Sequence, residues 1–209
     1  MKKILLLFVL SLSSIMHGQI NTQVSPYHIC NANNDSQVTF DLTTKIPEIL
    51  GSLNPEDYTI SFYRMGAILI STPQSYTESI YGISAVFVKV QNNTTGYITD
   101  VTLPLKVTTI PNIPPQEIHN CNDTNTGIST FSFYAISEKI RVSNILLAGY
   151  EIKYFNSQND AENNYNPFTG NTFTNTTPFT QVIYAQISKD DCFRVAPVTL
   201  KVSACVTAG

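Results

Sequence analysis

The chain has 209 residues, a formal net charge of −3 at pH 7 and only 13% charged residues. Ordinary soluble domains carry about 25% charged residues, so solubility here depends on Asn, Thr and Ser side chains. A net negative charge without a basic cluster excludes nucleic acid as an expected partner. Aromatic residues make up 11% of the chain, and aromatic and β-branched residues favour strands.

Residues 1–18 are typical of a secretory signal peptide. Lys2 and Lys3 precede the apolar run from Ile4 to Leu12, and small residues follow up to Gly18. The run is shorter than the roughly 20 residues that cross a bilayer. We therefore expect cleavage after Gly18, no membrane span, and export to the outer cell surface or the medium, with the periplasm as an alternative.

The mature chain contains the same pattern twice. The segment from His28 to Asn31 returns 91 positions later (119 − 28) as His119 to Asn122. The segment from Tyr58 to Tyr63 returns as Tyr150 to Phe155. An internal repeat of this kind indicates one fold unit used in tandem.

A proline-rich segment separates the two copies. Residues 110–116 contain three prolines, and such segments are stiff and extended. We interpret them as a spacer between a first module at residues 27–109 and a second at residues 117–203, the alternative being an edge strand that tolerates prolines. Residues 204–209 are expected to be a tail or the start of a truncated further module.

Alternating apolar residues predict strands in both copies, because a period of two leaves one face buried and one face wet. The predicted strands lie at residues 58–63, 86–90, 101–107, 150–154, 182–187 and 198–202. Residues 45–50 and 138–147 are predicted to be helical, at matching places in the two copies. Many short strands with frequent turns predict an all-β fold of two antiparallel sandwiches.

A series of motifs in the first copy follows an order known from one family. These motifs are Cys30 to Asp35, Thr39 to Thr43, Tyr58 to Tyr63, Val86 to Val90, Asn93 to Gly96 and Leu103 to Val107. The second copy matches through Cys121 to Asp123, Gly127, Phe131, Asp160, Ala161, Thr174, Asn175, Ile183 to Ala185 and Cys192.

This pattern resembles the module repeated in very large surface proteins of flavobacteria and their gliding relatives. The resemblance implies immunoglobulin-like β-sandwich modules, a secreted or cell-surface location, and a role in adhesion or stalk building. It brings no catalytic motif with it.

The same resemblance implies a disulfide. In the family pattern the opening cysteine of a module pairs with a late cysteine, and the second copy keeps both as Cys121 and Cys192. The late position of the first copy is Tyr97, so Cys30 has no partner in its own module, and Cys205 lies beyond the last predicted strand. Four cysteines allow three full pairings, and the partners of Cys30 and Cys205 stay open.

Two sets of residues are candidates for metal sites. His28 and His119 each precede a cysteine by two positions, and two such pairs would supply the four ligands of a zinc site. The spacing is not that of a zinc finger, and exposed strand histidines are the favoured interpretation. Asn31, Asp35 and Asp123 lie in oxygen-rich segments that could bind calcium, but polar turns are favoured. We therefore expect no cofactor.

Catalytic motifs are absent from the sequence: it has no Gly-x-Ser-x-Gly, His-Glu-x-x-His or phosphate-binding glycine loop. The sequence favours a non-enzymatic exported spacer or adhesion module of a repeat-type adhesin, which binds an unidentified surface, glycan or protein. The alternative is a carbohydrate-binding accessory module of a secreted polysaccharide-degrading system. For that function Tyr63, Phe87 and Phe155 are the candidate ligand-binding residues, because the alternation places them opposite the predicted core.

Overall fold

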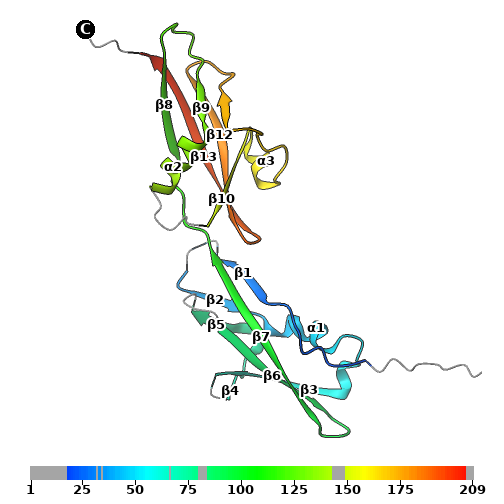
Figure 1. Ribbon diagram of the computed structural model, residues 1–209. Coiled ribbons are helices and arrows are strands. Elements are labelled where there is room, and N and C mark those ends of the chain that lie inside the picture. Colours follow the sequence, from blue (N-terminus) through cyan, green and yellow to red (C-terminus); the bar gives the residue numbers. More distant parts are fainter. Residues whose placement is uncertain are drawn as a thin grey trace, which may run out of the picture. The chain divides into compact units, whose positions relative to one another are not determined.

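The computed structural model describes residues 18–31, 33, 35–65, 67–79, 84–142 and 149–205 (Figure 1). Residues 1–17 of the predicted signal peptide and residues 206–209 of the predicted tail lie outside this part. Strands dominate the described residues, as predicted for an all-β chain.

The first repeat contains strands β1 to β7, with short helical turns between them. The strands are β1 (Tyr27–Asn31), β2 (Gln37–Phe40), β3 (Tyr58–Arg64), β4 (Ile68–Leu69), β5 (Tyr76–Ser79), β6 (Ser84–Asn92) and β7 (Ile98–Thr109). The helical turns are η1 (Leu42–Lys45), α1 (Ile46–Leu50), η2 (Pro55–Asp57) and η3 (Pro73–Ser75).

The second repeat contains strands β8 to β13 and two helices. The strands are β8 (Gln116–Asn122), β9 (Thr130–Ser132), β10 (Glu151–Phe155), β11 (Thr172–Thr174), β12 (Thr180–Lys189) and β13 (Cys192–Ala204). The helices are α2 (Phe133–Val142) and α3 (Gln158–Glu162).

All six predicted strands are confirmed, as β3, β6, β7, β10, β12 and β13, and the first predicted helix is confirmed as α1. The second helix, α2, begins at Phe133 rather than at residue 138. Ser132 accepts a hydrogen bond from the backbone N–H of Ala135, which is how a serine caps a helix start. Residues 143–147 of the predicted helix lie outside the described residues.

Each repeat forms a larger and a smaller sheet, as in a sandwich. The first repeat has a five-stranded sheet of order β1-β7-β6-β3-β4 and the two-stranded sheet β2-β5. The second repeat has a four-stranded sheet of order β10-β12-β13-β8 and the two-stranded sheet β11-β9. The chain therefore consists of two tandem immunoglobulin-like β-sandwich domains, as the sequence predicted.

The pairing of β8 with β13 is parallel, which differs from the purely antiparallel arrangement expected. These are the first and last strands of the repeat, and the long connection between them supplies the crossover that parallel neighbours require. The register pairs Cys121 with Ser203, and this register decides which cysteines can meet.

The chain divides into two compact units whose boundary does not follow the repeats. One unit comprises the residues up to Tyr27, Phe40–Tyr76 and Ser84–Leu105, and the other comprises His28–Thr39, Thr77–Ile83 and the residues from Lys106 onward. Most of β1 and the end of β7 therefore belong to the second unit. Ile110 and Ile113 of the proline-rich segment are buried in its core.

Strand alternation explains the buried residues of the first unit. Val88 and Val90 on β6 are fully buried, as is Leu103 on β7, whereas Phe87 on β6 is 45% exposed. In the second unit an aromatic stack forms part of the core, with the rings of Phe133 and Tyr154 4.5 Å apart. Burial raises the pKa of Tyr154 to about 12, so its hydroxyl stays protonated and hydrogen-bonded to Ser137.

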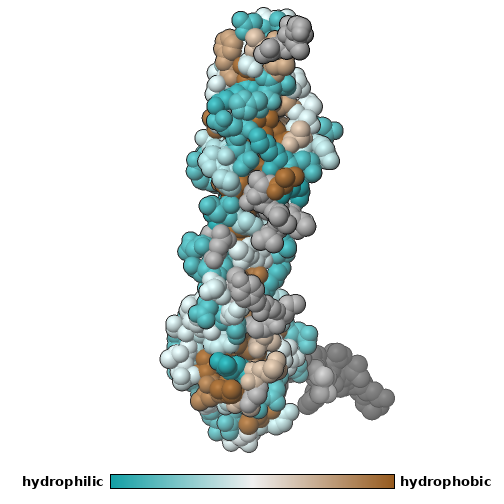
Figure 2. All heavy atoms as spheres, turned by 90° about the vertical axis from the view of Figure 1, so that its left-hand side faces the viewer, coloured by the Kyte–Doolittle hydropathy of each residue, from teal (hydrophilic) through white to brown (hydrophobic). Residues whose placement is uncertain are grey.

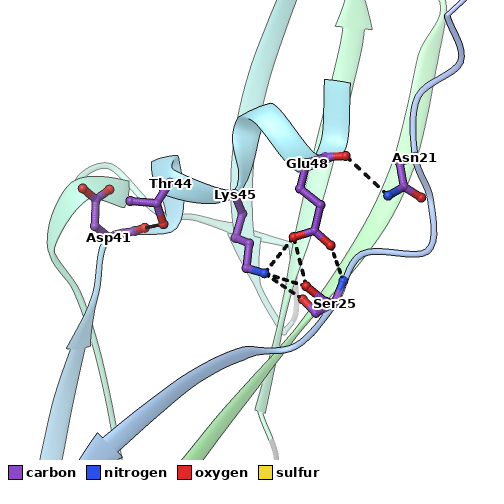
Figure 3. Close-up of polar contacts among 6 residues, drawn as sticks. All are labelled: Asn21, Ser25, Asp41, Thr44, Lys45 and Glu48. Carbon is purple, nitrogen blue, oxygen red and sulfur yellow. Dashed lines mark hydrogen bonds and ion pairs between the residues drawn. The ribbon is translucent and has the colours of Figure 1, made fainter. Parts of the chain in front are cut away.

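A polar cluster attaches the segment before β1 to α1 (Figure 3). The Glu48 carboxylate pairs with Lys45 Nζ at 2.8 Å and accepts a hydrogen bond from the Ser25 hydroxyl at 3.0 Å. Asn21 N–H donates to the carbonyl of Ile49 at 2.8 Å. Hydrogen bonds from Lys45 and then from Ser25 lower the pKa of Glu48 to about 2, so the cluster stays charged at ordinary pH.

Candidate functional site

Two disulfides join distant parts of the chain. Cys30 on β1 bonds to Cys192 at the start of β13, with the two Cα atoms 5.5 Å apart. Cys121 on β8 bonds to Cys205, just after β13, with the Cα atoms 4.8 Å apart. The first bond ties a strand of repeat one to a strand of repeat two.

The expected pairing of Cys121 with Cys192 is therefore wrong. In the β8–β13 register Cys121 lies opposite Ser203, 11 residues after Cys192 (203 − 192). At about 3.3 Å per residue, this puts Cys192 roughly 36 Å away along the strand. A disulfide needs Cα atoms within about 7 Å, which Cys205, two residues beyond Ser203, satisfies.

A chain of polar contacts lies beside the Cys30–Cys192 bond. His28 Nε2 lies 3.0 Å from Thr108 Oγ1, and the Thr108 hydroxyl donates to Asp190 Oδ2 at 2.7 Å. Lys106 Nζ pairs with the other carboxylate oxygen of Asp190 at 2.8 Å. These contacts, Lys106 first and Thr108 second, lower the pKa of Asp190. The Asp190 carboxylate thus holds the β12–β13 turn against the end of β7, through Lys106 and Thr108.

His28 also contacts the disulfide, since its Nε2 lies 3.6 Å from Cys192 Sγ. The ligating atoms of His28, Cys30 and Cys192 all lie within 4.8 Å of one another. Among the described residues, this is the one group of three or more potential metal-ligating side chains that converges. In the disulfide state the two sulfurs are bonded to each other, so the His28 imidazole is the one side chain of this group that could bind a metal ion.

The structure separates the two histidines of the repeated His-x-Cys pattern. His119 is exposed on β8, and its Nε2 lies 3.5 Å from a carboxylate oxygen of Glu117. It is not part of the group around His28. A shared zinc site of His28 and His119 is therefore not formed.

The three calcium candidates occupy polar turns. Asn31 is buried, and its side chain accepts from Asp35 N–H at 3.1 Å and donates to Asp35 O at 2.7 Å. Asp123 is exposed on the matching turn of the second repeat. There the side-chain oxygen of Asn122, which matches Asn31, accepts a hydrogen bond from Thr124 N–H at 2.7 Å. The side-chain amides thus hold the turns themselves.

Two of the three aromatic candidates share a surface. The register places Tyr63 on β3 directly opposite Phe87 on β6 and opposite Leu69 on β4. We call the two aromatic residues of this group, Tyr63 and Phe87, the aromatic row. Phe87 and Leu69 are 45% and 58% exposed. Figure 2 shows hydrophobic side chains, coloured brown, gathered on the lower part of this face. They lie at the height at which Figure 1 shows β4.

The aromatic row borders a depression of about 330 Å³ in the first unit. Tyr63 and Phe87 line it together with Lys89 and Asp100, whose side chains form an ion pair at 3.1 Å. An apolar surface with a few polar groups at its margin is the usual composition of a ligand-binding surface.

The third aromatic candidate, Phe155, cannot contact a ligand, because it is fully buried. Alternation on β10 places it opposite the core residue Tyr154, but α3 packs against β10 and β12 and covers that face. Gln186 Nε2 on β12 donates to the carbonyl of Ala161 on α3 at 2.6 Å, which fixes this cover.

Comparison with known proteins agrees with the tandem organisation. The chain matches the family model "Flavobacterium inter-domain disulphide bond domain" twice, over residues 26–111 and 117–206. None of the curated proteins matches it significantly. No helix among the described residues has the length and hydropathy of a membrane span.

Similar solved structures contain several immunoglobulin-type domains in tandem. Extracellular domains 3–5 of Drosophila OTK are 10% identical, with a TM-score of 0.42 over 90% of this chain and 62% of that chain. An I-band fragment of titin is 7% identical, with a TM-score of 0.33 over 90% and 66%. The insect immune protein hemolin is 8% identical, with a TM-score of 0.31 over 91% and 49%. This chain thus spans about half to two thirds of each.

Proposed function

We propose, from the premise that this chain belongs to the Flavobacterium inter-domain disulphide bond family, that it is a non-enzymatic exported spacer module that transmits tension in a cell-surface adhesin. The observation that carries this proposal is the Cys30–Cys192 disulfide. It joins the opening strand of the first repeat to the closing strand of the second.

The disulfide shortens the covalent path through the chain. Tension applied before Cys30 and after Cys192 passes directly between the two sulfurs and bypasses a sequence separation of 162 residues. An extended chain spans at most about 3.3–3.6 Å per residue, so the intact bond prevents the chain from extending by roughly 550 Å under tension. A spacer built in this way keeps its length even when a domain between the two cysteines unfolds.

Export is consistent with the same chemistry. Disulfides persist in oxidising compartments outside the cytosol, and both bonds here close long loops. The basic, apolar and small-residue order of residues 1–18 supports a signal peptide that directs the chain there.

Single-molecule pulling on handles attached before Cys30 and after Cys205 tests the spacer function. The oxidised chain is expected to lengthen little, whereas full reduction should release roughly 550 Å. In the double variant Cys30→Ser with Cys192→Ser, the Cys121–Cys205 bond still closes the second repeat. Only the 91 residues from Cys30 to Cys121 (121 − 30) are then freed, a gain of roughly 310 Å.

The matched control is Cys121→Ser with Cys205→Ser, which removes the other disulfide. Because Cys30–Cys192 still carries the tension, this variant should lengthen no more than the native chain. A release of several hundred ångströms from the oxidised native chain would show that the bypass does not operate and would contradict the spacer proposal.

Carbohydrate binding is the second candidate, and the aromatic row favours it. Phe87 and Tyr63 offer flat apolar surface, and the Lys89–Asp100 pair offers a donor and acceptors at its edge. Beads that carry several copies of the chain should be retained on polysaccharide surfaces more strongly than beads with single copies, because weak contacts add.

Replacing Phe87 with serine should weaken the binding of a single copy to polysaccharide about tenfold, which corresponds to about 1.4 kcal/mol of binding free energy. Phe193→Ser is the matched control, because Phe193 on β13 is 48% exposed, close to the 45% of Phe87. Equal binding by both variants would leave carbohydrate recognition by this surface without support. Hydrolysis of the polysaccharide would contradict the non-enzymatic assignment.

A further inference from the structure

The group of His28, Cys30 and Cys192 has the geometry of a metal site whose two sulfurs are joined. A tetrahedral zinc ion lies about 2.3 Å from sulfur and about 2.0–2.1 Å from nitrogen, so a bound nitrogen and sulfur are about 3.6 Å apart. His28 Nε2 and Cys192 Sγ lie 3.6 Å apart. The imidazole is therefore already placed at the ligand–ligand distance that zinc requires.

We propose that reduction of the Cys30–Cys192 disulfide creates a binding site for a thiophilic divalent cation of the Zn²⁺ type, held by His28 Nε2, Cys30 Sγ and Cys192 Sγ. The metal then replaces the covalent tie between β1 and β13. The bond between the repeats thus has two chemical forms, a disulfide and a bridging metal.

The conversion balances with a dithiol as reductant. One thiolate of the dithiol attacks Cys30 Sγ, because Cys30 is exposed and Cys192 is only 2% exposed. The S–S bond breaks, the electron pair leaves on Cys192 Sγ, and a mixed disulfide forms at Cys30. The second thiol of the reagent displaces Cys30 and closes the reagent's own disulfide. Two protein thiols result, and a divalent cation then displaces their two protons.

The donor set favours a borderline-soft cation. Two thiolates and one imidazole suit zinc or cobalt, whereas magnesium and calcium prefer oxygen ligands. A tetrahedral ion would keep one position for water, as open zinc sites do. Asp190 lies next to Thr108, the present hydrogen-bond partner of His28, so its carboxylate adds negative charge near the ion.

The second disulfide supplies an internal comparison. Cys121 also follows a histidine by two residues, yet His119 is exposed beside Glu117 and does not converge with the Cys121 and Cys205 sulfurs. The sequence motif is the same in both repeats, and only the first His-x-Cys meets a third ligand. Reduction of the second disulfide therefore leaves a site of two ligands at most.

The test is a titration of the full mature chain with Co²⁺, after reduction and removal of the reductant without oxygen. The reduced native chain is expected to bind one Co²⁺ with a thiolate-to-cobalt charge-transfer band, and Zn²⁺ should displace it. Loss of an outer-shell partner weakens metal binding 10–100-fold, so His28→Asn should weaken it by at least about 100-fold. His119→Asn, which changes the matching histidine, should bind like the native chain.

Both variants keep all four cysteines, so unspecific binding by reduced thiols affects them equally. Circular dichroism of each reduced chain, with and without Zn²⁺, shows whether folding depends on the metal. If reduction unfolds the chain, Zn²⁺ should restore the folded spectrum in the native chain and in His119→Asn, but not in His28→Asn. Equal Co²⁺ affinity in all three proteins, or no thiolate band in the native chain, would overturn the proposal.

Discussion

The double substitution Cys30→Ser with Cys192→Ser is expected to lower the free energy of unfolding by about 3–5 kcal/mol. The bond closes a loop with a sequence separation of 162 residues. The chain-entropy estimate for a loop of that length is about 5 kcal/mol, and measured losses for native disulfides are typically about 2–5 kcal/mol. Urea denaturation followed by circular dichroism, with linear extrapolation, measures the difference.

The paired control is Cys121→Ser with Cys205→Ser, which opens a loop with a sequence separation of 84 residues. Peptide mapping of the unreduced native chain should recover Cys30 linked to Cys192 and Cys121 linked to Cys205. Recovery of Cys121 linked to Cys192 would contradict the structure. A midpoint and slope for Cys30→Ser with Cys192→Ser that match those of the native chain would show that the bond does not stabilise the fold.

Strand positions could be predicted because a strand that is buried on one face has apolar residues at alternate positions in the sequence. Val88, Val90 and Leu103 alternate with exposed or half-buried neighbours, and the structure buries all three. That signal is local, since a strand with one buried face carries apolar residues at every second position. The tandem fold follows from the repeat of such strands in the same order.

Disulfide partners could not be predicted in this way, because pairing depends on which strands become neighbours. The parallel register of β8 and β13 brings Cys121 to the end of β13 that carries Cys205. One sequence signal did point toward the outcome. The first repeat holds the single cysteine Cys30, and an odd cysteine in an exported module must pair outside that module or stay free.

Environment separates residues that the sequence treats as equivalent. His28 and His119 occupy matching positions, but only His28 meets the Cys192 sulfur. Phe87 and Phe155 both alternate with core residues, but α3 covers Phe155 whereas Phe87 stays exposed. Such differences arise from tertiary packing, and periodicity along one strand does not encode them.

The structural role of Asn175 could not be predicted from the sequence, because this residue lies in an Asn- and Thr-rich stretch that resembles an ordinary turn. The structure leaves it only 2% exposed. Its side-chain oxygen accepts from Ser129 N–H at 2.7 Å. Its Nδ2 donates to the carbonyls of Gly127 at 2.8 Å and Thr177 at 2.7 Å. One amide thus joins the loop after β8 to the loop after β11.

Replacing Asn175 with alanine is expected to lower the free energy of unfolding by about 3–5 kcal/mol. The change leaves three backbone groups without their partner, and each buried group left unsatisfied costs about 1–3 kcal/mol. Asn175→Asp should be no less harmful, because it keeps the acceptor for Ser129 but turns an oxygen toward two carbonyl oxygens. Urea denaturation with both disulfides intact gives the values.

The graded control is Asn120→Ala, in the same unit of the fold. The Asn120 side chain makes two exposed hydrogen bonds: Nδ2 donates to the carbonyl of Thr130 at 3.0 Å, and Oδ1 accepts from Cys121 N–H at 2.9 Å. Their loss should cost about 1–2 kcal/mol, because exposed backbone groups regain hydrogen bonds to water. Both variants remove an asparagine side chain that bonds only to backbone groups, and the two sites differ chiefly in burial. If Asn175→Ala costs no more than Asn120→Ala, the amide of Asn175 does not hold the two loops together, and their arrangement must depend on packing alone.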